Sequence, residues 1–210
     1  MAVDPSGKIF VSGASEGIES NYVMITIKYV QQNVVILLNS MIEGFYNIIE
    51  NKAICDTTRV FLRNTISPYA IVDSAISISD SSGYGIFNFQ VFGNENSFYI
   101  VIKHRNSIET WSNQKIIFHG NQISYDFTTG ANKAYGNNLV LKGSKYCLYS
   151  GDPNQDGIID LTDVNLIYND AKNAVSGYVK SDLNGDNFVD LSDLTLAFNN
   201  STGFISVLKP

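Results

Sequence analysis

The chain has 210 residues, of which 44% are hydrophobic and 16% charged, and its formal net charge at pH 7 is −6. This length suits one large domain or two small ones with a buried core, and the composition excludes a disordered chain. The shortage of lysine and arginine argues against a nucleic-acid-binding protein, and no apolar run reaches the roughly 18 residues that a membrane span needs.

Residues 1–30 are predicted to contain two β-strands, Lys8–Ser12 and Tyr22–Val30. The sequence DPSGKIFVSGAS followed by NYVMITIKYV resembles the last two strands of a β-propeller-type repeat. The alternative is a β-hairpin that belongs to the following domain. The segment lacks the apolar core of a secretory signal, so we expect any export signal to lie upstream or to have been removed.

The first of these strands leads into Gly13, Ser15 and Gly17, which match the G-x-S-x-G pattern of a nucleophile elbow. That elbow holds its serine on a tight turn between a strand and a helix, whereas the β-branched residues that follow here favour a second strand. A Ser/His/acid hydrolase would also need His104 or His119 as its base, since the chain has two histidines.

Each histidine also has a structural interpretation. His104 stands in a polar cluster at a strand end, which is typical of a solvated edge, and His119 precedes Gly120 at a predicted turn. In the hydrolase alternative, Asp73, Asp126 or a glutamate would orient the base.

Residues 31–149 are predicted to form an antiparallel, immunoglobulin-like β-sandwich. Runs rich in β-branched and aromatic residues alternate with turn clusters such as 80–83 and 93–96, and no helical pattern separates them. The predicted strands are Val34–Leu38, Thr57–Arg63, Ala75–Ser79, Gly85–Phe92, Phe98–Arg105, Lys115–Phe118, Ile123–Phe127 and Leu139–Tyr149. The stretch DSSGYGIFNFQVFGNENSFYIVIKHRN resembles the immunoglobulin- or transthyretin-like modules of secreted Bacteroidetes–Ignavibacteria-type proteins, and this resemblance implies the fold.

Three further residues of this region have two interpretations each. Cys55 and Cys147 form a disulfide across the sandwich if the protein is extracellular, or remain buried free thiols. Trp111, the single tryptophan, packs in the core or offers a ring on which a glycan stacks.

The net charge is confined to residues 151–210. That segment carries nine acidic residues, all of them aspartate, against three lysines, whereas residues 1–150 carry 11 acidic and 11 basic residues. Exclusive use of the shorter carboxylate indicates a geometric requirement instead of bulk charge. We therefore predict three regions: a hairpin at 1–30, a sandwich at 31–149 and a third domain at 150–210.

The third domain contains a repeat with a period of 30 residues. Two 12-residue loops, 152–163 and 182–193, carry oxygen-bearing side chains at positions 1, 3, 5, 9 and 12, the spacing at which such a loop wraps a calcium ion. The predicted ligands of one ion are Asp152, Asn154, Asp156, Ile158 (through its carbonyl), Asp160 and Asp163; those of a second are Asp182, Asn184, Asp186, Phe188 (through its carbonyl), Asp190 and Asp193. The alternative, a polar surface turn, does not account for two copies in register.

Position 6 of each loop requires a positive φ, which Gly157 adopts freely and Asn187 tolerates. The aliphatic residues at position 8, Ile159 and Val189, are predicted to pair the two loops and to bury their backs.

Each loop is followed by a predicted helix, over 161–169 and 191–200. These helices are too short to persist alone in water, so we expect ion binding to drive folding.

The segments GDPNQDGIIDLTDVNLIYN and SDLNGDNFVDLSDLTLAFN resemble the two F-hand-like calcium-binding segments of a type I dockerin, over about residues 150–200. Loop spacing, aspartate at position 12 and internal duplication carry the resemblance. It implies a small helical module with two calcium ions, an extracellular location and a cohesin-like partner. Loop positions 10 and 11, which help to select the cohesin in dockerins, are Leu161-Thr162 and Leu191-Ser192 here, where clostridial examples commonly have Ser/Thr pairs.

The sequence therefore predicts a secreted, calcium-binding, non-catalytic attachment module of a larger extracellular protein, with a cohesin-like protein or a glycan surface as its partner. The alternative is a calcium-dependent hydrolase of small esters or lactones. It would use Ser15 with a histidine, or a calcium ion with an open coordination position that polarises the carbonyl. A purely structural spacer is the third hypothesis.

Overall fold

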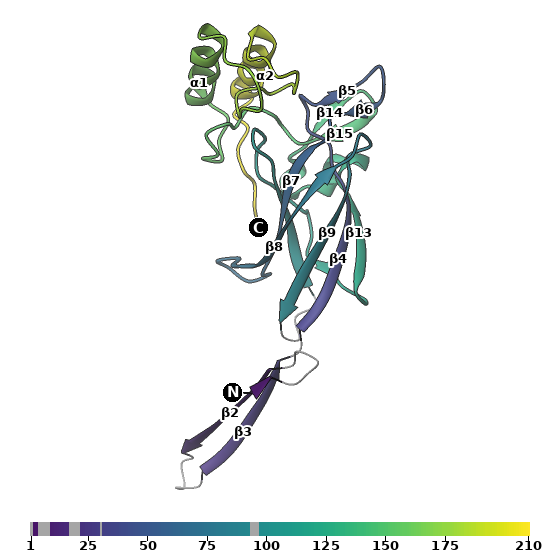
Figure 1. Ribbon diagram of the computed structural model, residues 1–210, viewed down its shortest axis with the longest axis vertical. Coiled ribbons are helices and arrows are strands. Elements are labelled where there is room, and N and C mark those ends of the chain that lie inside the picture. Colours follow the sequence, from purple (N-terminus) through teal and green to yellow (C-terminus); the bar gives the residue numbers. More distant parts are fainter. Residues whose placement is uncertain (1, 4–8, 17–21, 30, 93–96) are drawn as a thin grey trace.

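Figure 1 shows the chain as a computed structural model, which describes residues 2–3, 9–16, 22–29, 31–92 and 97–210. Strands dominate, and two helices lie together at one end, so the prediction of a mainly β fold with a small helical part is confirmed. None of the described helices is long and apolar enough to cross a membrane.

Two facing sheets form the sandwich. One has the strand order β11-β10-β7-β8, with β12 also paired to β10, and the other has the order β13-β4-β9. Their strands are β4 (Gln31–Asn39), β7 (Asp56–Arg63), β8 (Ile71–Ser79), β9 (Tyr84–Phe92), β10 (Ser97–Lys103), β11 (Thr110–Trp111), β12 (Ile116–Ile117) and β13 (Gln122–Asp126). Neighbouring strands are antiparallel except β13, which runs parallel to β4.

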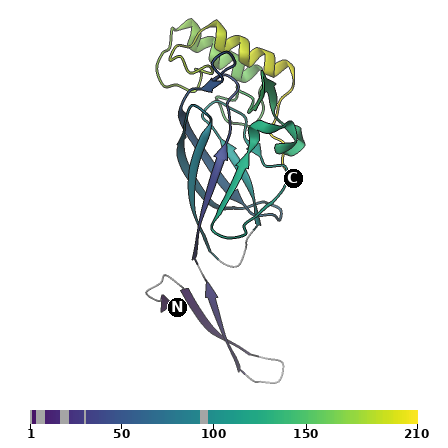
Figure 2. The same cartoon turned by 90° about the vertical axis from the view of Figure 1, so that its right-hand side faces the viewer.

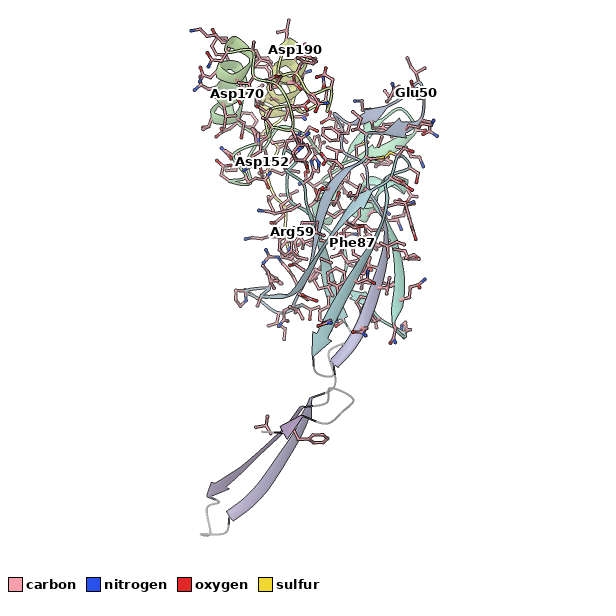
Figure 3. The ribbon with its side chains drawn as sticks, in the orientation of Figure 1. Glu50, Arg59, Phe87, Asp152, Asp170 and Asp190 are labelled. Atoms are coloured by element: carbon pink, nitrogen blue, oxygen red, sulfur yellow. The ribbon has the colours of Figure 1, made fainter. Side chains whose placement is uncertain are left out.

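The core lies between these sheets because alternate residues of each strand point inward. On β10, Phe98, Ile100 and Ile102 are buried, as their alternation predicts. Phe87 on β9 is 1% exposed and lies among the side chains drawn in Figure 3. The core cluster also includes Val34, Ile36, Leu38, Val60, Leu62, Phe89 and Val91.

The N-terminal strands form a sheet of their own. Its strands are β1 (Ala2–Val3), β2 (Ile9–Glu16) and β3 (Tyr22–Tyr29), in the order β1-β2-β3. The two predicted strands are thus present, and within the described residues they pair with no strand of the sandwich. Figures 1 and 2 show β2 and β3 beyond the end of the sandwich that lies away from the helices. The resemblance to a propeller repeat stays a prediction.

One predicted strand is wrong in its extent. The run 139–149 is divided into β14 (Val140–Lys142) and β15 (Lys145–Cys147), which form a hairpin. Gly143 adopts a φ of 61° in the turn between them, a conformation that costs glycine little.

Several short elements have no periodicity by which the sequence could reveal them. They are β5 (Tyr46–Asn47), β6 (Lys52–Ala53) and three 3₁₀ helices, Phe127–Thr129, Ala131–Lys133 and Tyr135–Asn137. The turn predicted at 93–96 lies outside the described residues.

The two predicted helices are confirmed as α1 (Leu161–Lys172) and α2 (Leu191–Thr202). Each begins at a capping box, in which the N-cap side chain accepts from a backbone N–H and the side chain of the third helical residue accepts from the N-cap N–H. The helices lie against each other over a small apolar core (Figure 2) that comprises Ile167, Leu183, Val189 and Ala197.

Candidate metal centre

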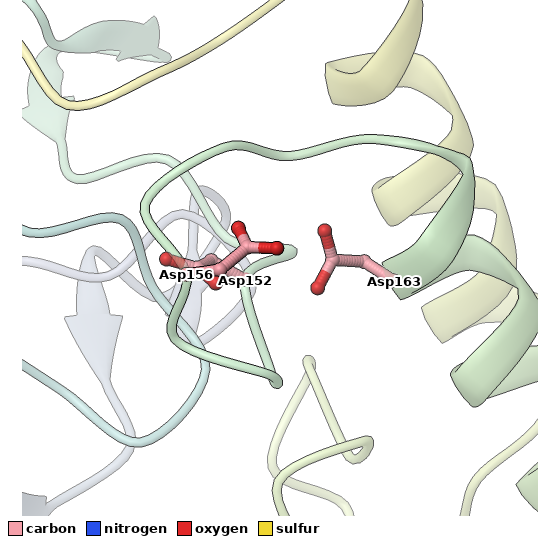
Figure 4. Close-up of side chains that lie close together, drawn as sticks. All are labelled: Asp152, Asp156 and Asp163. Carbon is pink, nitrogen blue, oxygen red and sulfur yellow. The ribbon is translucent and has the colours of Figure 1, made fainter.

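The first loop brings three carboxylates together. Asp152, Asp156 and Asp163 each offer an oxygen, and these oxygens all lie within 4.8 Å of one another. Figure 4 shows Asp163 entering from the start of α1 and facing the two side chains of the loop. Asp152 and Asp163 are buried, whereas Asp156 is exposed. Three like charges at this separation repel one another unless a cation or protons neutralise them.

The surroundings of Asp152 disfavour its ionised form. Burial raises the pKa of its carboxyl to about 6, and the neighbouring charges of Asp163 and Asp156 act in the same direction. Asp152 Oδ1 is buried and has no hydrogen-bond partner among the described residues. An unpartnered buried carboxylate oxygen is costly, and a hard divalent cation with oxygen ligands would satisfy it. The residues of the first loop therefore fit a calcium ion.

The backbone of both loops turns as the sequence predicts. At position 6, Gly157 has a φ of 91° and Asn187 a φ of 68°. Position 4 also adopts a positive φ, at Gln155 (63°) and Gly185 (78°), which the sequence analysis missed. In the second loop, the glycine at position 185 could have indicated this positive φ from the sequence alone.

The side chains at positions 3 and 5 shape the first loop. Asn154 Oδ1 accepts a hydrogen bond from the N–H of Asp156 at 2.8 Å, and Asp156 Oδ1 accepts from the N–H of Ile158 at 3.0 Å. Asn184 and Asp186 repeat both bonds in the second loop. The amide Nδ2 of Asn154 also donates to Asp156 Oδ2 at 2.9 Å, and Asn184 donates to Asp186 at 3.0 Å. These bonds curl each loop.

Positions 7 and 8 pair with other segments, so the prediction that the two loops pair with each other is wrong. The N–H of Ile159 donates to Ile205 at 2.8 Å, and that of Val189 donates to Val175 at 3.0 Å. At position 7, Ile158 bridges to Ser206, and Phe188 bridges to Ser176. The predicted burial of position 8 is confirmed, at 0% exposure for Ile159 and 4% for Val189.

Positions 9 and 12 also build the helix starts. Asp160 accepts from the N–H of Thr162 at 2.7 Å, and Asp163 Oδ2 accepts from the N–H of Asp160 at 3.1 Å. Asp190 and Asp193 do the same at α2. Position 9 of a calcium loop often reaches its ion through water, so a capping carboxylate there agrees with the loop pattern.

The second loop holds its first ligand differently. Asp182 is buried; its Oδ1 accepts from the N–H of Gly185 at 2.7 Å and its Oδ2 from that of Asn187 at 3.2 Å. Arg105 of the sandwich places Nη2 3.6 Å from Asp182 Oδ2. Within the described part of the chain, the first loop alone shows three acidic groups converging within 4.8 Å. In the sequence, Arg105 only ends the predicted strand Phe98–Arg105, and no local pattern indicates its approach to Asp182.

His104 is buried in a polar network at the end of β10. Its Nε2 lies 3.0 Å from Asp56 Oδ2, and its Nδ1 lies 3.0 Å from Asn106 Oδ1. Burial alone would raise the pKa of Asp56, but hydrogen bonds from His104, Tyr178 and Arg105 hold it well below its usual range. The predicted solvated edge is therefore wrong for His104, which is 3% exposed.

The structure does not bring the candidate catalytic residues together. Ser15 lies within β2, where its backbone pairs with Val23, and not at a strand-to-helix turn; Gly17 lies outside the described residues. His104 is joined through Asn106 to the second loop, at the end of the sandwich away from β2. His119 is exposed in the turn before β13.

Trp111 packs in the core, the first of its two predicted roles. It is 2% exposed, its Nε1 donates to Glu109 at 2.8 Å, and its ring packs against Tyr69 and Tyr99. The tryptophan ring is therefore not open for glycan stacking. Cys55 is exposed and Cys147 is buried, and both are free thiols.

An apolar groove of ≈ 470 Å³ lies between the exposed faces of α1 and α2. Its lining consists of four pairs of repeat-equivalent residues: Leu161 with Leu191, Val164 with Leu194, Asn165 with Thr195, and Tyr168 with Phe198. Both leucines at loop position 10 are about 70% exposed, at 70% and 72%. Large apolar side chains that are exposed together in a groove are typical of an interaction surface.

No family model and no curated protein sequence matches the chain. Two crystal structures of type II cohesin–X-dockerin complexes from Acetivibrio cellulolyticus, a C-terminal and an N-terminal interface mutant, have chains that are similar in structure. Each is 16% identical with a TM-score of 0.41, and the matches cover 82% and 83% of this chain and 99% of the other chain. A likeness of this strength assigns neither a function nor a partner, so the dockerin-like nature of residues 150–200 stays a prediction.

Proposed function

We propose that the chain is a non-catalytic attachment module of a secreted protein, stabilised by calcium and docking a protein partner through the groove between α1 and α2. The observation that carries the calcium part is the first loop, where three carboxylates converge and Asp152 Oδ1 is buried without a partner. A bound calcium ion would supply the positive charge that neutralises these groups. The extracellular concentration of calcium, near millimolar, fills even weak sites of this class.

The protein-docking part rests on the groove. Its two-helix lining is apolar apart from Asn165 and Thr195, so a hydrophobic protein surface suits it better than a sugar. Because the loops form the N-terminal caps of both helices, an ion that orders the loops also orders this surface. A cohesin-like protein is the partner that the sequence resemblance implies. Among the described residues, no geometric observation favours the hydrolase alternative.

Calcium titration calorimetry on the full chain, together with thermal unfolding in chelator and in millimolar calcium, tests the first part. We expect heat of binding and a higher melting temperature with calcium. Glu50→Gln removes one exposed acidic charge that belongs to neither loop and serves as the control, with unchanged binding. The metal site would be refuted if the chain bound no calcium and its melting temperature were the same in chelator and in calcium.

Capture by immobilised type I and type II cohesins, with and without calcium, tests the second part. The double variant Leu161→Asp/Leu191→Asp changes two exposed side chains, so it is expected to fold normally and to lose capture. Ile76→Asp, at a residue of β8 that is 56% exposed, is the matched control outside the groove. Capture that survives in the double variant would contradict the groove as the docking surface, and binding to a glycan panel instead of any cohesin would contradict the protein partner.

A further inference from the structure

Arg105 follows β10 and reaches from the sandwich to the second loop. Its Nε lies 3.0 Å from Asp56 Oδ2, and its guanidinium carbon lies 4.4 Å from the ring centroid of Tyr178. Its Nη2 is 3.6 Å from Asp182 Oδ2, and its side chain is 12% exposed. A fixed, largely buried positive charge therefore stands beside the residue at position 1 of the second loop.

Asp182 is held by the sandwich through its backbone as well. Asn106 Nδ2 donates to the Asp182 carbonyl at 2.7 Å, and Arg105 donates to the same carbonyl at 3.3 Å. With the N–H groups of Gly185 and Asn187 on the carboxylate, each oxygen of Asp182 has a partner within the protein itself.

The corresponding residue of the first loop also bonds to the sandwich through its backbone, since the Asp152 N–H donates to the Asn106 carbonyl at 3.1 Å, but its carboxylate has no such cation within the part of the chain that the structure describes. Asp152 Oδ1 has no hydrogen-bond partner, and among the described residues no lysine, arginine or histidine forms an ion pair with Asp152. Two loops with the same sequence pattern are thus placed in different electrostatic surroundings by the sandwich.

We propose that Arg105 serves as an internal counter-cation for the second loop: it keeps that loop formed without calcium and weakens calcium binding there. This inference rests on the proposed calcium-binding function. A fixed cation beside the ligands repels a divalent ion, and the affinity of calcium loops depends on the charge of their ligand set. The first loop, which has no such cation, is then the site that responds to calcium.

Calcium titration calorimetry on the full chain tests this. Asp152→Asn leaves the second loop to be measured, and Asp182→Asn leaves the first. We expect the second loop to bind calcium at least about tenfold more weakly than the first. Adding Arg105→Gln to the Asp152→Asn chain is expected to tighten binding by about tenfold.

The control is Lys103→Gln, which removes the same charge two residues away, at the end of β10, but breaks only an ion pair with Glu109. It is expected to leave both dissociation constants unchanged. Equal affinities of the two loops, or equal effects of the substitutions at 105 and 103, would overturn the role of Arg105 while leaving the proposed function intact. Absence of binding at both loops would overturn the proposed function and this inference with it.

A measurement on the unaltered chain covers the case in which Arg105→Gln does not fold. In chelator, hydrogen exchange is expected to show slower exchange for the amides of 184–187 than for those of the equivalent residues 154–157. Equal exchange rates in the two loops would overturn the inference.

Discussion

Asp152→Asn is expected to change stability in opposite directions with and without calcium. Burial, with Asp163 and Asp156 nearby, raises the pKa of Asp152 from 3.8 to about 6. Without metal, the carboxyl of Asp152 therefore binds its proton more tightly in the folded protein than in the unfolded chain. The unfolding free energy contributed by this group consequently falls as pH rises from about 4 to about 6 and is level above that window.

The size of the effect follows from the displacement of the pKa. Because the pKa of Asp152 rises from 3.8 to about 6, ionisation of this carboxyl lowers the free energy of unfolding by about 3 kcal/mol. Asparagine removes the charge, and its amide can donate to the facing carboxylates of Asp156 and Asp163. In chelator at pH 7.5, Asp152→Asn is thus expected to be more stable than the wild type by up to about 3 kcal/mol, and at pH 4 the two are expected to be nearly equal.

Urea unfolding followed by circular dichroism at pH 4, 5, 6 and 7.5 measures both free energies. In millimolar calcium the order is expected to reverse, because the variant has lost a ligand of the first loop. Glu50→Gln, run in parallel, shows whether the loss of any exposed acidic charge has the same effect. A variant that is less stable than the wild type in chelator at pH 7.5 would refute the electrostatic reasoning.

Two further predictions concern packing. Gly44→Ala would place a Cβ 1.9 Å from the carbonyl oxygen of Leu183, so the backbone must shift, and we expect a loss of about 1–3 kcal/mol in urea unfolding; an unchanged value would show that the sandwich and the second loop do not pack this closely. Phe87→Ala empties a fully buried site and is expected to cost about 3–5 kcal/mol, whereas Ile76→Ala on the exposed face of β8 should cost less than about 0.5 kcal/mol. Comparable losses for the two would contradict the assignment of inner and outer faces.

The sequence predicted those features that depend on local patterns. The positive φ of Gly157 and Asn187, the two helices, and the burial of alternate residues on β10 all follow from short-range steric and hydrophobic rules. The alternation held on the inner face of β10 but not wholly on the outer face. Val101, which pairs with Trp111 of β11, is 0% exposed there although it alternates with core residues.

The features that the sequence did not predict depend on contacts between distant segments. The parallel pairing of β13 with β4 and the pairing of Ile159 with Ile205 involve partners that no local pattern specifies. The same holds for Arg105, whose approach to Asp182 crosses from the sandwich to the helical part. The repeat was visible in the sequence, but the difference between its two loops was not, because that difference comes from the surface on which they rest.

The position of β4 has a mechanical consequence. This strand runs along the long axis of the sandwich (Figure 1), with nine residues in register with β9 on one side and five with β13 on the other. Tension applied along that axis would shear the pairings of β4 with β9 and with β13. Many backbone hydrogen bonds would then have to break at once instead of one after another. Such a strand resists traction far better than one that is peeled from a sheet edge.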